Sequence, residues 1–408
     1  MTEEIFNGLK VVELANFISG PYCGQMMANL GAEVIKIEKP KVGDDSRSFG
    51  PFPNDTPHLE RSGLFLCLNT NKLGMTLDVK TDRGREILLE LLKKADIFIE
   101  NNPPKLIDEL RLGYETLKKI NPRLIVTSIT PFGQTGPLRD YKGEAINTAG
   151  MGGFSLTVGE PGRPPITAPL SLGHYQSGGI AAFATITALI ARDKTERGQH
   201  IDVSELDTWA GAVTGQLISA YIFKGMKKTR SGYRTSGSVY PTVILPCKDG
   251  YVWLVAIMGY QWKRFLEIMG GGKIPDWYAN DPRFKDRREM AIKYGEELDN
   301  RIIPWLMKHT KKEFFAIARE NHLPFTPVQD IGEVMNEEQF KERPFFVDVD
   351  HPETGTLRYP GAPFRLSETP WKIKGHAPLL GQHNEEILSN YLGYSREEIE
   401  QLREDEII

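Results

Sequence analysis

Eight histidines and three cysteines are the side chains of this sequence best suited to metal or nucleophilic chemistry. The cysteines, Cys23, Cys67 and Cys247, have no paired spacing, which argues against a disulfide framework and against a cysteine-based zinc site. The histidines are scattered, and none forms a pair with metal-ligand spacing. Neither a Gly-x-Ser-x-Gly motif nor a phosphate-binding glycine motif occurs. We therefore expect no metal site, no tightly bound cofactor and no serine-hydrolase chemistry.

Composition and charge exclude two classes of partner. The 408 residues carry a net charge of −4, so sequence-independent binding to nucleic acid is not expected. The acidic N-terminal segment lacks a signal-peptide pattern, and no run of about 18 apolar residues could span a membrane. The few cysteines fit a reducing compartment. The sequence thus predicts a soluble, cytoplasmic protein with room for two domains.

Strands and helices alternate along the first third of the chain. Residues 11–14 and 34–37 are predicted strands, and residues 22–29 form the helix between them, closed by Gly31. Further strands are expected at 76–79, 97–99 and 124–128, and helices at 82–94 and 114–120. Such alternation predicts an α/β fold with a doubly wound parallel sheet, whose ligands lie at the carboxyl ends of its strands.

The middle of the chain is more apolar. Residues 178–191 are apolar on all sides, so this helix is expected to be deeply buried. A strand at 201–203 and a long helix at 206–223 follow. The polar connection at 224–238 predicts a domain boundary. The first domain therefore covers residues 1–223.

A smaller α+β domain is expected at residues 239–324. Asp249-Gly250 lies between two apolar runs and predicts a β-hairpin. Residues 326–408 form a proline-rich, extended segment that ends in two amphipathic helices. This segment is expected to return to the first domain or to embrace a partner subunit. The helices expected after the hairpin lie at 261–269, 287–301 and 312–321, and those at the C-terminus near 384–392 and 396–402.

Short phrases spread over nearly the whole chain resemble those of the family III CoA-transferases and occur in the same order. Each phrase is weak alone, but the ordered set is specific. The resemblance implies a Rossmann-like large domain with a parallel sheet built from both chain ends, a small α+β domain, and two subunits threaded through each other as an interlocked dimer. The phrases include Gly20-Pro21, Gly31-Ala32-Glu33-Val34-Ile35-Lys36, Gly133-Gln134-Thr135-Gly136-Pro137, Lys248-Asp249-Gly250 and Ala377-Pro378-Leu379-Leu380-Gly381-Gln382-His383.

The resemblance also implies that coenzyme A thioesters are the substrates. Coenzyme A carries anionic phosphates and a long pantetheine arm, so its site needs cations, helix N-termini and apolar walls. The family's phrase after the fourth strand is altered here, so the groove is expected to be reshaped. The positions that match binding residues are Phe17 and Ile18 at the thioester end, Asn101 at the pantetheine, Lys39 and Arg111 at the phosphates, and Lys142 as a further cation near the site.

The family's nucleophile is an aspartate in a Gly-Asp-x-x-x-Gly phrase just before a buried helix. Its carboxylate attacks the thioester carbonyl and forms a mixed anhydride. Here the phrase begins Gly173-His174 and ends at Gly178, so both glycines are present and His174 replaces the aspartate. An imidazole cannot form the aspartyl thioester that the transfer requires.

One interpretation is that this chain is the non-catalytic subunit of a heteromeric CoA-transferase, paired with a paralogue that keeps the aspartate. It resembles the heteromeric members that act on aromatic dicarboxylates, such as succinyl-CoA:benzylsuccinate CoA-transferase. Interlocked subunits make this physically reasonable, because a subunit can complete its partner's site after losing its own nucleophile. The expected partners are therefore the paralogous subunit and coenzyme A thioesters.

Two enzymatic alternatives stay open, besides a CoA-binding protein with a structural or regulatory task. The related methylacyl-CoA racemases use a histidine and an aspartate as paired acid and base. Glu144 stands where their histidine would be and His174 where their aspartate would be, so the pair is exchanged rather than lost. The other alternative is a homodimeric transferase in which Glu144 or Glu205 serves as the nucleophile.

Overall fold

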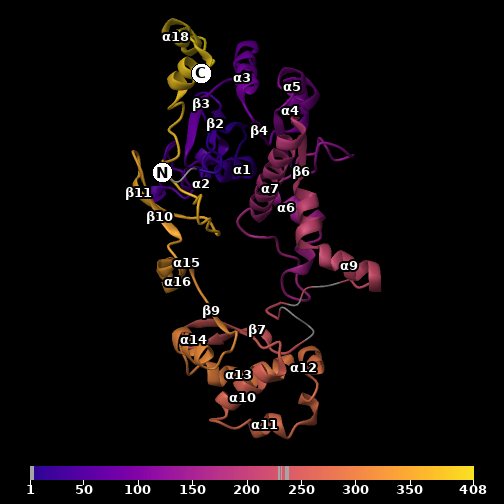
Figure 1. The fold of residues 1–408 in the computed structure, drawn as a ribbon. Coiled ribbons are helices and arrows are strands. Elements are labelled where there is room, and N and C mark those ends of the chain that lie inside the picture. The colour runs from indigo at the N-terminus through magenta and orange to yellow at the C-terminus, as the bar shows by residue number, and fades with distance from the viewer. Residues whose placement is uncertain (1–3, 228–229, 231, 235–238) are drawn as a thin grey trace. The chain divides into compact units, whose positions relative to one another are not determined.

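The computed structural model describes residues 4–227, 230, 232–234 and 239–408. The chain forms two compact units (Figure 1). The larger unit takes residues up to 154, then 167–225 and 343–408, and the smaller takes 155–166 and 226–342. Residues 155–166 thus belong to the smaller unit, although the sequence prediction placed them in the first domain. Residues 326–342 also belong to the smaller unit, although the prediction placed them in the returning tail.

The larger unit is built on a parallel sheet of six strands in the order β3-β2-β1-β4-β5-β6. This is the strand order of the Rossmann fold, in which the order reverses between β1 and β4. The predicted α/β class with a parallel sheet is confirmed. The strands are β1 (Lys10–Leu14), β2 (Glu33–Glu38), β3 (Lys72–Thr76), β4 (Ile97–Glu100), β5 (Ile125–Thr130) and β6 (His200–Ser204).

The third strand begins earlier than the expected range 76–79. The first residue of this strand is Lys72, a charged residue that the sequence pattern does not assign to a buried strand. Lys72 is nevertheless buried within the unit, and its ammonium group is hydrogen-bonded there. The three donors of this ammonium reach oxygens of Glu13, Pro21 and Asn69 at 2.8, 2.8 and 2.9 Å. Residues 77–80 instead form a loop beyond the strand end.

Two hydrophobic cores lie on opposite faces of this sheet. Neighbouring residues of β1 show this, because Val12 packs in one core and Val11 in the other. The first core includes side chains of the C-terminal helix, so the last part of the chain completes the larger unit. The main helices are α3 (Asp82–Lys94), α5 (Tyr114–Ile120) and α18 (Arg396–Glu404) on one face, and α1 (Ser19–Ala28) and α7 (Leu172–Thr195) on the other.

Helix α7 is covered on one face only. Ala181 packs in the core, whereas Ile180, Phe183 and Ile190 are exposed, Phe183 by 70%. The expectation of burial on all sides for residues 178–191 is therefore wrong for this chain by itself. An apolar face of α7 is left without cover.

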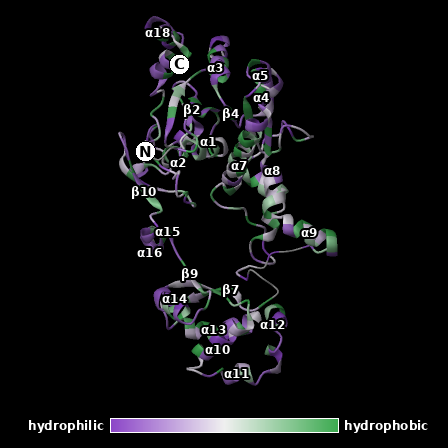
Figure 2. Cartoon of the chain, viewed as in Figure 1, coloured by the Kyte–Doolittle hydropathy of each residue, from purple (hydrophilic) through white to green (hydrophobic). Residues whose placement is uncertain are grey.

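The long helix expected at 206–223 is interrupted. The chain forms α8 (Glu205–Thr208), a π-helical turn η4 (Trp209–Val213) and α9 (Gly215–Lys224). The break lies where the Thr214 hydroxyl donates to the Gly152 carbonyl at 2.9 Å. Exposed apolar side chains end α9, which Figure 2 colours as hydrophobic.

The smaller unit contains the predicted hairpin. Strands β7 (Thr242–Cys247) and β8 (Gly250–Val255) pair antiparallel around Lys248-Asp249, which confirms the turn. The helix expected at 287–301 is two helices, α12 (Arg287–Lys293) and α13 (Gly295–Leu306). The unit also contains β9 (Thr326–Val328), α10 (Gly259–Met269), α11 (Asp276–Ala279), α14 (Lys311–Glu320), α15 (Ile331–Asn336) and α16 (Glu338–Glu342).

The remaining elements of the larger unit are short. They are the 3-10 helices η1 (Asp45–Ser48) and η2 (Pro53–Asp55), α2 (Gly63–Leu68), α4 (Pro104–Glu109), α6 (Ala145–Met151), the hairpin β10 (Phe346–His351) and β11 (Gly355–Pro360), α17 (Asn384–Glu386) and the π-helical η6 (Ile387–Leu392). Among the described residues, no helix has the length and apolar character of a membrane span.

Candidate functional site

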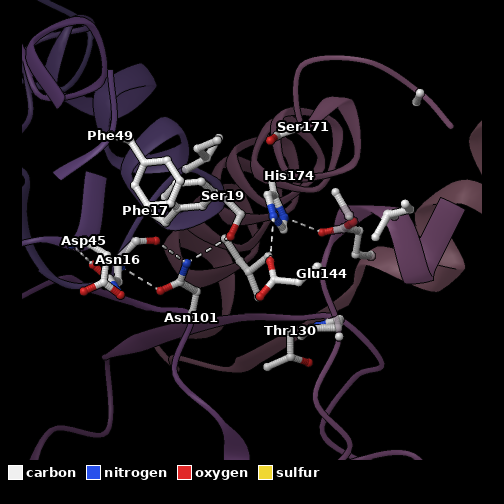
Figure 3. A pocket seen from close by; sticks show the side chains of 18 of the residues that line it. Asn16, Phe17, Ser19, Asp45, Phe49, Asn101, Thr130, Glu144, Ser171 and His174 are labelled. Carbon is white, nitrogen blue, oxygen red and sulfur yellow. Dashed lines mark hydrogen bonds and ion pairs between the residues drawn. The ribbon is translucent and has the colours of Figure 1, made fainter. Parts of the chain in front are cut away.

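A cavity of about 590 Å³ opens at the carboxyl ends of β1, β4, β5 and β6. Parallel sheets of this topology bind ligands at this edge, near the reversal of strand order. Helices α1 and α7 both begin here, so two helix N-termini join the strand ends (Figure 3). The wall includes Asn16, Phe17, Ile18, Asn101, Thr130, Glu144, Ser171, His174 and Glu205.

His174 lies in the first turn of α7 and lines this cavity. Its Nδ1 atom is 2.7 Å from Oε2 of Glu205, the residue that directly follows β6. The His174 side chain is 13% exposed and that of Glu205 only 3%. The other carboxylate oxygen of Glu205 accepts a hydrogen bond from the Thr148 hydroxyl. Both oxygens of this buried acid are therefore engaged.

The two glycines that flank His174 make this packing possible. A Cβ atom on Gly173 would lie 2.3 Å from Oε1 of Glu205, and one on Gly178 would lie 2.5 Å from the Ser19 carbonyl oxygen. Both distances are far shorter than van der Waals contact. Gly173 thus makes room for the Glu205 carboxylate, and Gly178 lets α7 lie close against α1.

Glu144 approaches His174 from the start of α6. Its side chain is 78% exposed, and its Oε2 atom is 3.9 Å from Nε2 of His174. This distance lies within ion-pair range but is too long for a hydrogen bond. The Glu144 backbone N–H donates to Asn147 Oδ1 at 2.9 Å, which fixes the start of the helix. The two candidate catalytic residues therefore meet on the cavity wall.

The loop between β1 and α1 forms another part of the wall. Phe17 has a positive φ of 67°, which is uncommon for an aromatic residue. Its N–H donates to Asp44 Oδ1 at 3.0 Å, and its ring centroid lies 5.8 Å from that of His174. Asn101 donates to the Asn16 carbonyl at 2.7 Å and accepts from the Asn16 N–H at 2.8 Å. These bonds hold the aromatic ring against the imidazole.

A network of buried charges anchors this loop. The Lys36 ammonium donates to Asp44 Oδ2 at 2.7 Å and to Glu13 Oε1 at 3.1 Å. Burial alone would lower the pKa of Lys36, but the carboxylates of Asp44, Glu13 and Glu38 raise it above its usual value. Burial lowers the pKa of Lys72 to about 8, against the opposing attraction of Glu13. The positive-φ backbone of Phe17 is thus held by Asp44, which is itself paired with the buried Lys36.

Glu100 is a second buried acid near the cavity. It ends β4, directly before Asn101, and burial raises its pKa to about 7. Its Oε2 atom accepts a hydrogen bond from the Asn102 N–H at 2.9 Å. Among the described residues, none gives its Oε1 atom a hydrogen bond. The carboxyl group is therefore poised to hold a proton near neutral pH.

A second cavity, of about 340 Å³, lies at the carboxyl ends of β1, β2 and β3. It combines apolar walls, such as Ile37 and Leu77, with the exposed lysines Lys39, Lys41 and Lys80. Asn16 lines both cavities, so the two adjoin at this residue. Apolar walls with cations at the edge suit an extended ligand that ends in phosphates.

Of the eight candidate site residues, five line the first cavity: Phe17, Ile18, Asn101, Glu144 and His174. Lys39 lines the second cavity. Arg111 and Lys142 are exposed and line neither of these two, although Lys142 directly precedes Gly143 on the wall of the first.

The sequence prediction missed two features of the site. Lys80 was not singled out; strand β3 ends at Thr76, so Lys80 lies in the loop after it and lines the second cavity. Glu205 was considered only as a nucleophile, and its role as the partner of His174 was not foreseen. The sequence offered one indication of this role, an acidic residue just after a predicted strand. Residues at such positions lie at the edge of a parallel sheet where ligands bind.

The cysteines are free thiols, and Cys23 and Cys247 are buried. Within the described part of the chain, no group of three or more His, Cys, Asp or Glu side chains is placed to hold a metal ion. The acid and imidazole side chains that line the first cavity are those of Asp45, Glu144, His174 and Glu205.

The chain is similar to known proteins in both sequence and structure. A sequence model described as CoA-transferase family III matches residues 6–384. The chain is 33% identical over 404 residues to succinyl-CoA:(R)-benzylsuccinate CoA-transferase subunit BbsE of Thauera aromatica, covering 97% of this chain and 96% of that protein. It is 32% identical over 387 residues to succinate–glutarate CoA-transferase of Agrobacterium fabrum, covering 94% of each. A solved structure of a CAIB/BAIF family protein from Brucella suis superposes with a TM-score of 0.84 at 30% identity, covering 95% of this chain and 99% of that one.

Proposed function

Because the chain belongs to CoA-transferase family III, we propose that it is a subunit of a heteromeric CoA-transferase and does not supply the reaction's nucleophile. The complex moves coenzyme A from an acyl-CoA, such as succinyl-CoA, to a carboxylic acid. A paralogous subunit carrying the catalytic aspartate provides the attacking carboxylate. The observation that carries the proposal is the His174 imidazole at the start of α7, hydrogen-bonded to Glu205.

The chemistry of the transfer requires a carboxylate at that position. A carboxylate and a thioester exchange through an anhydride of similar energy, so the reaction runs in both directions. An imidazole at the same place forms no such anhydride. Glu205 cannot substitute without a rearrangement, because it is 3% exposed and its oxygens are bonded to His174 and Thr148.

The exposed apolar surface of the larger unit supports a partner subunit. Ile180, Phe183 and Ile190 form an uncovered stripe on α7, and Ile222 and Phe223 lie exposed at the end of α9. Apolar patches of this kind mark contact surfaces in soluble proteins. The similarity to a protein named as a transferase subunit points the same way. We assign this stripe to the interface with the paralogue in an interlocked dimer.

We place coenzyme A across the two adjoining cavities. Its phosphates lie beside Lys39 and Lys80 in the second cavity, where cations are exposed. The pantetheine arm passes Asn16 and Asn101, and the thioester reaches the first cavity beside Phe17. Arg111 and Lys142 then serve as outer cations.

The acyl group is proposed to be a dicarboxylic or aromatic acid handled in a cytosolic degradation pathway. The two curated relatives described above carry a succinyl or succinate group in their names. Phe17 and Phe49, whose ring centroids are 4.9 Å apart, line the first cavity and can pack against an apolar or aromatic acyl chain.

The decisive experiment compares the purified chain with its complex. The first step is to find a family III paralogue encoded beside this chain that keeps Gly-Asp at the phrase occupied here by Gly173-His174. The complex should form acceptor thioester from succinyl-CoA and an aromatic dicarboxylate, and the chain alone should form none, as followed by mass spectrometry of the thioesters. Robust transfer by the lone chain would contradict the proposal.

A second candidate is a homodimeric transferase that uses Glu144. One observation favours it: the Glu144 carboxylate is exposed on the cavity wall beside His174. In that case the lone chain transfers CoA and Glu144→Gln abolishes the activity. The racemase alternative requires an acid and a base about 6 Å apart, with the α-carbon between them at about 3 Å from each. The present separation of 3.9 Å leaves no room for that carbon unless Glu144 swings away.

A further inference from the structure

The hydrogen bond between His174 and Glu205 selects one tautomer of the imidazole. With the Glu205 carboxylate as the acceptor, the Nδ1 atom, 2.7 Å from Glu205 Oε2, is the donor and carries the hydrogen. In the neutral ring the other nitrogen, Nε2, is then a bare acceptor. Because His174 lines the cavity while Glu205 is buried, this basic nitrogen is the one available to a ligand or water.

The remaining surroundings are those of a general-base site. Glu205 is itself held by the Thr148 hydroxyl, so its carboxylate cannot rotate freely. Gly173 keeps the space that this carboxylate occupies, since a Cβ there would lie 2.3 Å from Oε1. The Glu144 carboxylate, 3.9 Å from Nε2, stabilises the imidazolium that forms when Nε2 takes a proton.

We propose that His174 and Glu205 form a general-base pair that activates water and hydrolyses acyl-CoA thioesters in this subunit's own cavity. The inference rests on the proposed function in one respect, because an acyl-CoA must enter the first cavity. It goes beyond that function, since no acceptor acid and no partner nucleophile take part.

The reaction is balanced without any further reagent. Nε2 of His174 takes a proton from water as the water oxygen bonds to the thioester carbonyl carbon. The tetrahedral intermediate then expels the thiolate as its C–S bond breaks, and His174 returns the proton to sulfur. The products are the free acid and coenzyme A thiol. Glu205 accepts the hydrogen bond from Nδ1 throughout and orients the ring, as a positioning residue.

The start of α1 supplies a place for the developing negative charge. Ile18 and Ser19 line the same cavity, and the first N–H groups of a helix have no carbonyl partner within it. Unpaired N–H groups at the start of a helix stabilise an anion that lies beside them. The base on α7 and the donors on α1 are held together by the close contact of the two helices at Gly178.

The test measures thiol release from acetyl-CoA and succinyl-CoA by the purified full-length chain with no acceptor acid. We expect release well above the buffer rate. His174→Ala should reduce it by a factor of about 100 or more, and Glu205→Gln by about 10 or more. Added imidazole should restore part of the activity of His174→Ala, which a merely structural defect would not allow. His322→Asn is a matched control, because His322 is exposed in the smaller unit at a φ of 54° that asparagine adopts readily.

Several results would overturn the inference. Calorimetric binding of the thioester without thiol release excludes hydrolysis and leaves the proposed function standing. Absence of binding overturns the inference and the placement of coenzyme A in this chain's two cavities, whereas the subunit proposal is decided by transfer in the complex. Activity that survives His174→Ala but disappears in Glu144→Gln assigns the base to Glu144 instead.

Discussion

The buried carboxylate of Glu205 lies 2.7 Å from Nδ1 of His174, so the cavity presents the imidazole to a ligand and keeps the acid engaged behind it. Where a family member attacks with a carboxylate, this chain offers a ring nitrogen supported by a carboxylate. In this chain the buried Glu205 therefore supports the imidazole through a hydrogen bond.

Restoring the aspartate should require changing both residues. In His174→Asp the new carboxylate faces Glu205, and two like charges at short distance raise the pKa of one of them. We expect His174→Asp alone to transfer no CoA, and His174→Asp with Glu205→Gln to gain transferase activity in the lone chain. Mass spectrometry of the acceptor thioester measures the gain, with Glu205→Gln alone as the control. Equal activity of the single and double variants would show that Glu205 does not oppose a nucleophile at this position.

Gly173 should be essential to the packing of the pair, and Gly179 should not. A Cβ on Gly173 would lie 2.3 Å from Glu205 Oε1, whereas one on Gly179 of the same helix has no neighbouring atom within 4 Å. We expect Gly173→Ala to lower the free energy of unfolding by about 1–3 kcal/mol. Gly179→Ala should raise it by about 0.5–1 kcal/mol, because alanine loses less backbone freedom in a helix. Chemical denaturation of the lone chain measures both, and equal effects would contradict the packing described.

Glu100 should make stability depend on pH. Its pKa is about 7 in the folded chain and near the ordinary 4.5 when unfolded, so the folded state holds more protons between these values. Its contribution therefore falls as pH rises through this window. Glu100→Gln removes the effect, and we expect its stability relative to the unaltered chain to improve by about 1–3 kcal/mol between pH 5 and pH 8. Denaturant unfolding at the two pH values measures this, and an unchanged difference would contradict the assignment.

The uncovered face of α7 should control assembly with the paralogue. Phe183→Asp places a charge on an apolar side chain that is 70% exposed and central to the stripe. We expect at least a tenfold loss of affinity for the partner, because a buried unpaired charge is costly. Ile292→Asp is the control, since Ile292 is 64% exposed but belongs to the smaller unit. Analytical ultracentrifugation of the mixed subunits measures the affinity of each variant for the partner. An equal loss of affinity in the two variants would show that α7 is not part of the interface.

Much of the fold follows from local pattern. Helices 82–94 and 114–120 agree with the structure at both ends, because their apolar side chains recur at helical spacing. The side chain of Thr81 also caps the first of them. The third strand was misplaced because Lys72 is buried through long-range bonds that no local pattern reveals. The long helix 206–223 was wrong because the side chain of Thr214 bonds to a distant carbonyl.

The shared location of several predicted site residues agrees with the sequence analysis, whereas their geometry could not be foreseen. Phe17, Asn101, Glu144 and His174 were expected, and the fold brings them to one cavity. The role of Glu205 depends on burial and on a hydrogen bond between residues 31 positions apart. Such relationships arise only when strand ends and helix starts meet in space.

The stripe of apolar side chains on α7 has a consequence for how the protein is made. Under the proposed heteromeric assembly, a copy that has left the ribosome without its partner exposes this surface to water, where it favours aggregation and recognition by chaperones. That assembly would then require the two polypeptides to be synthesised in matched amounts.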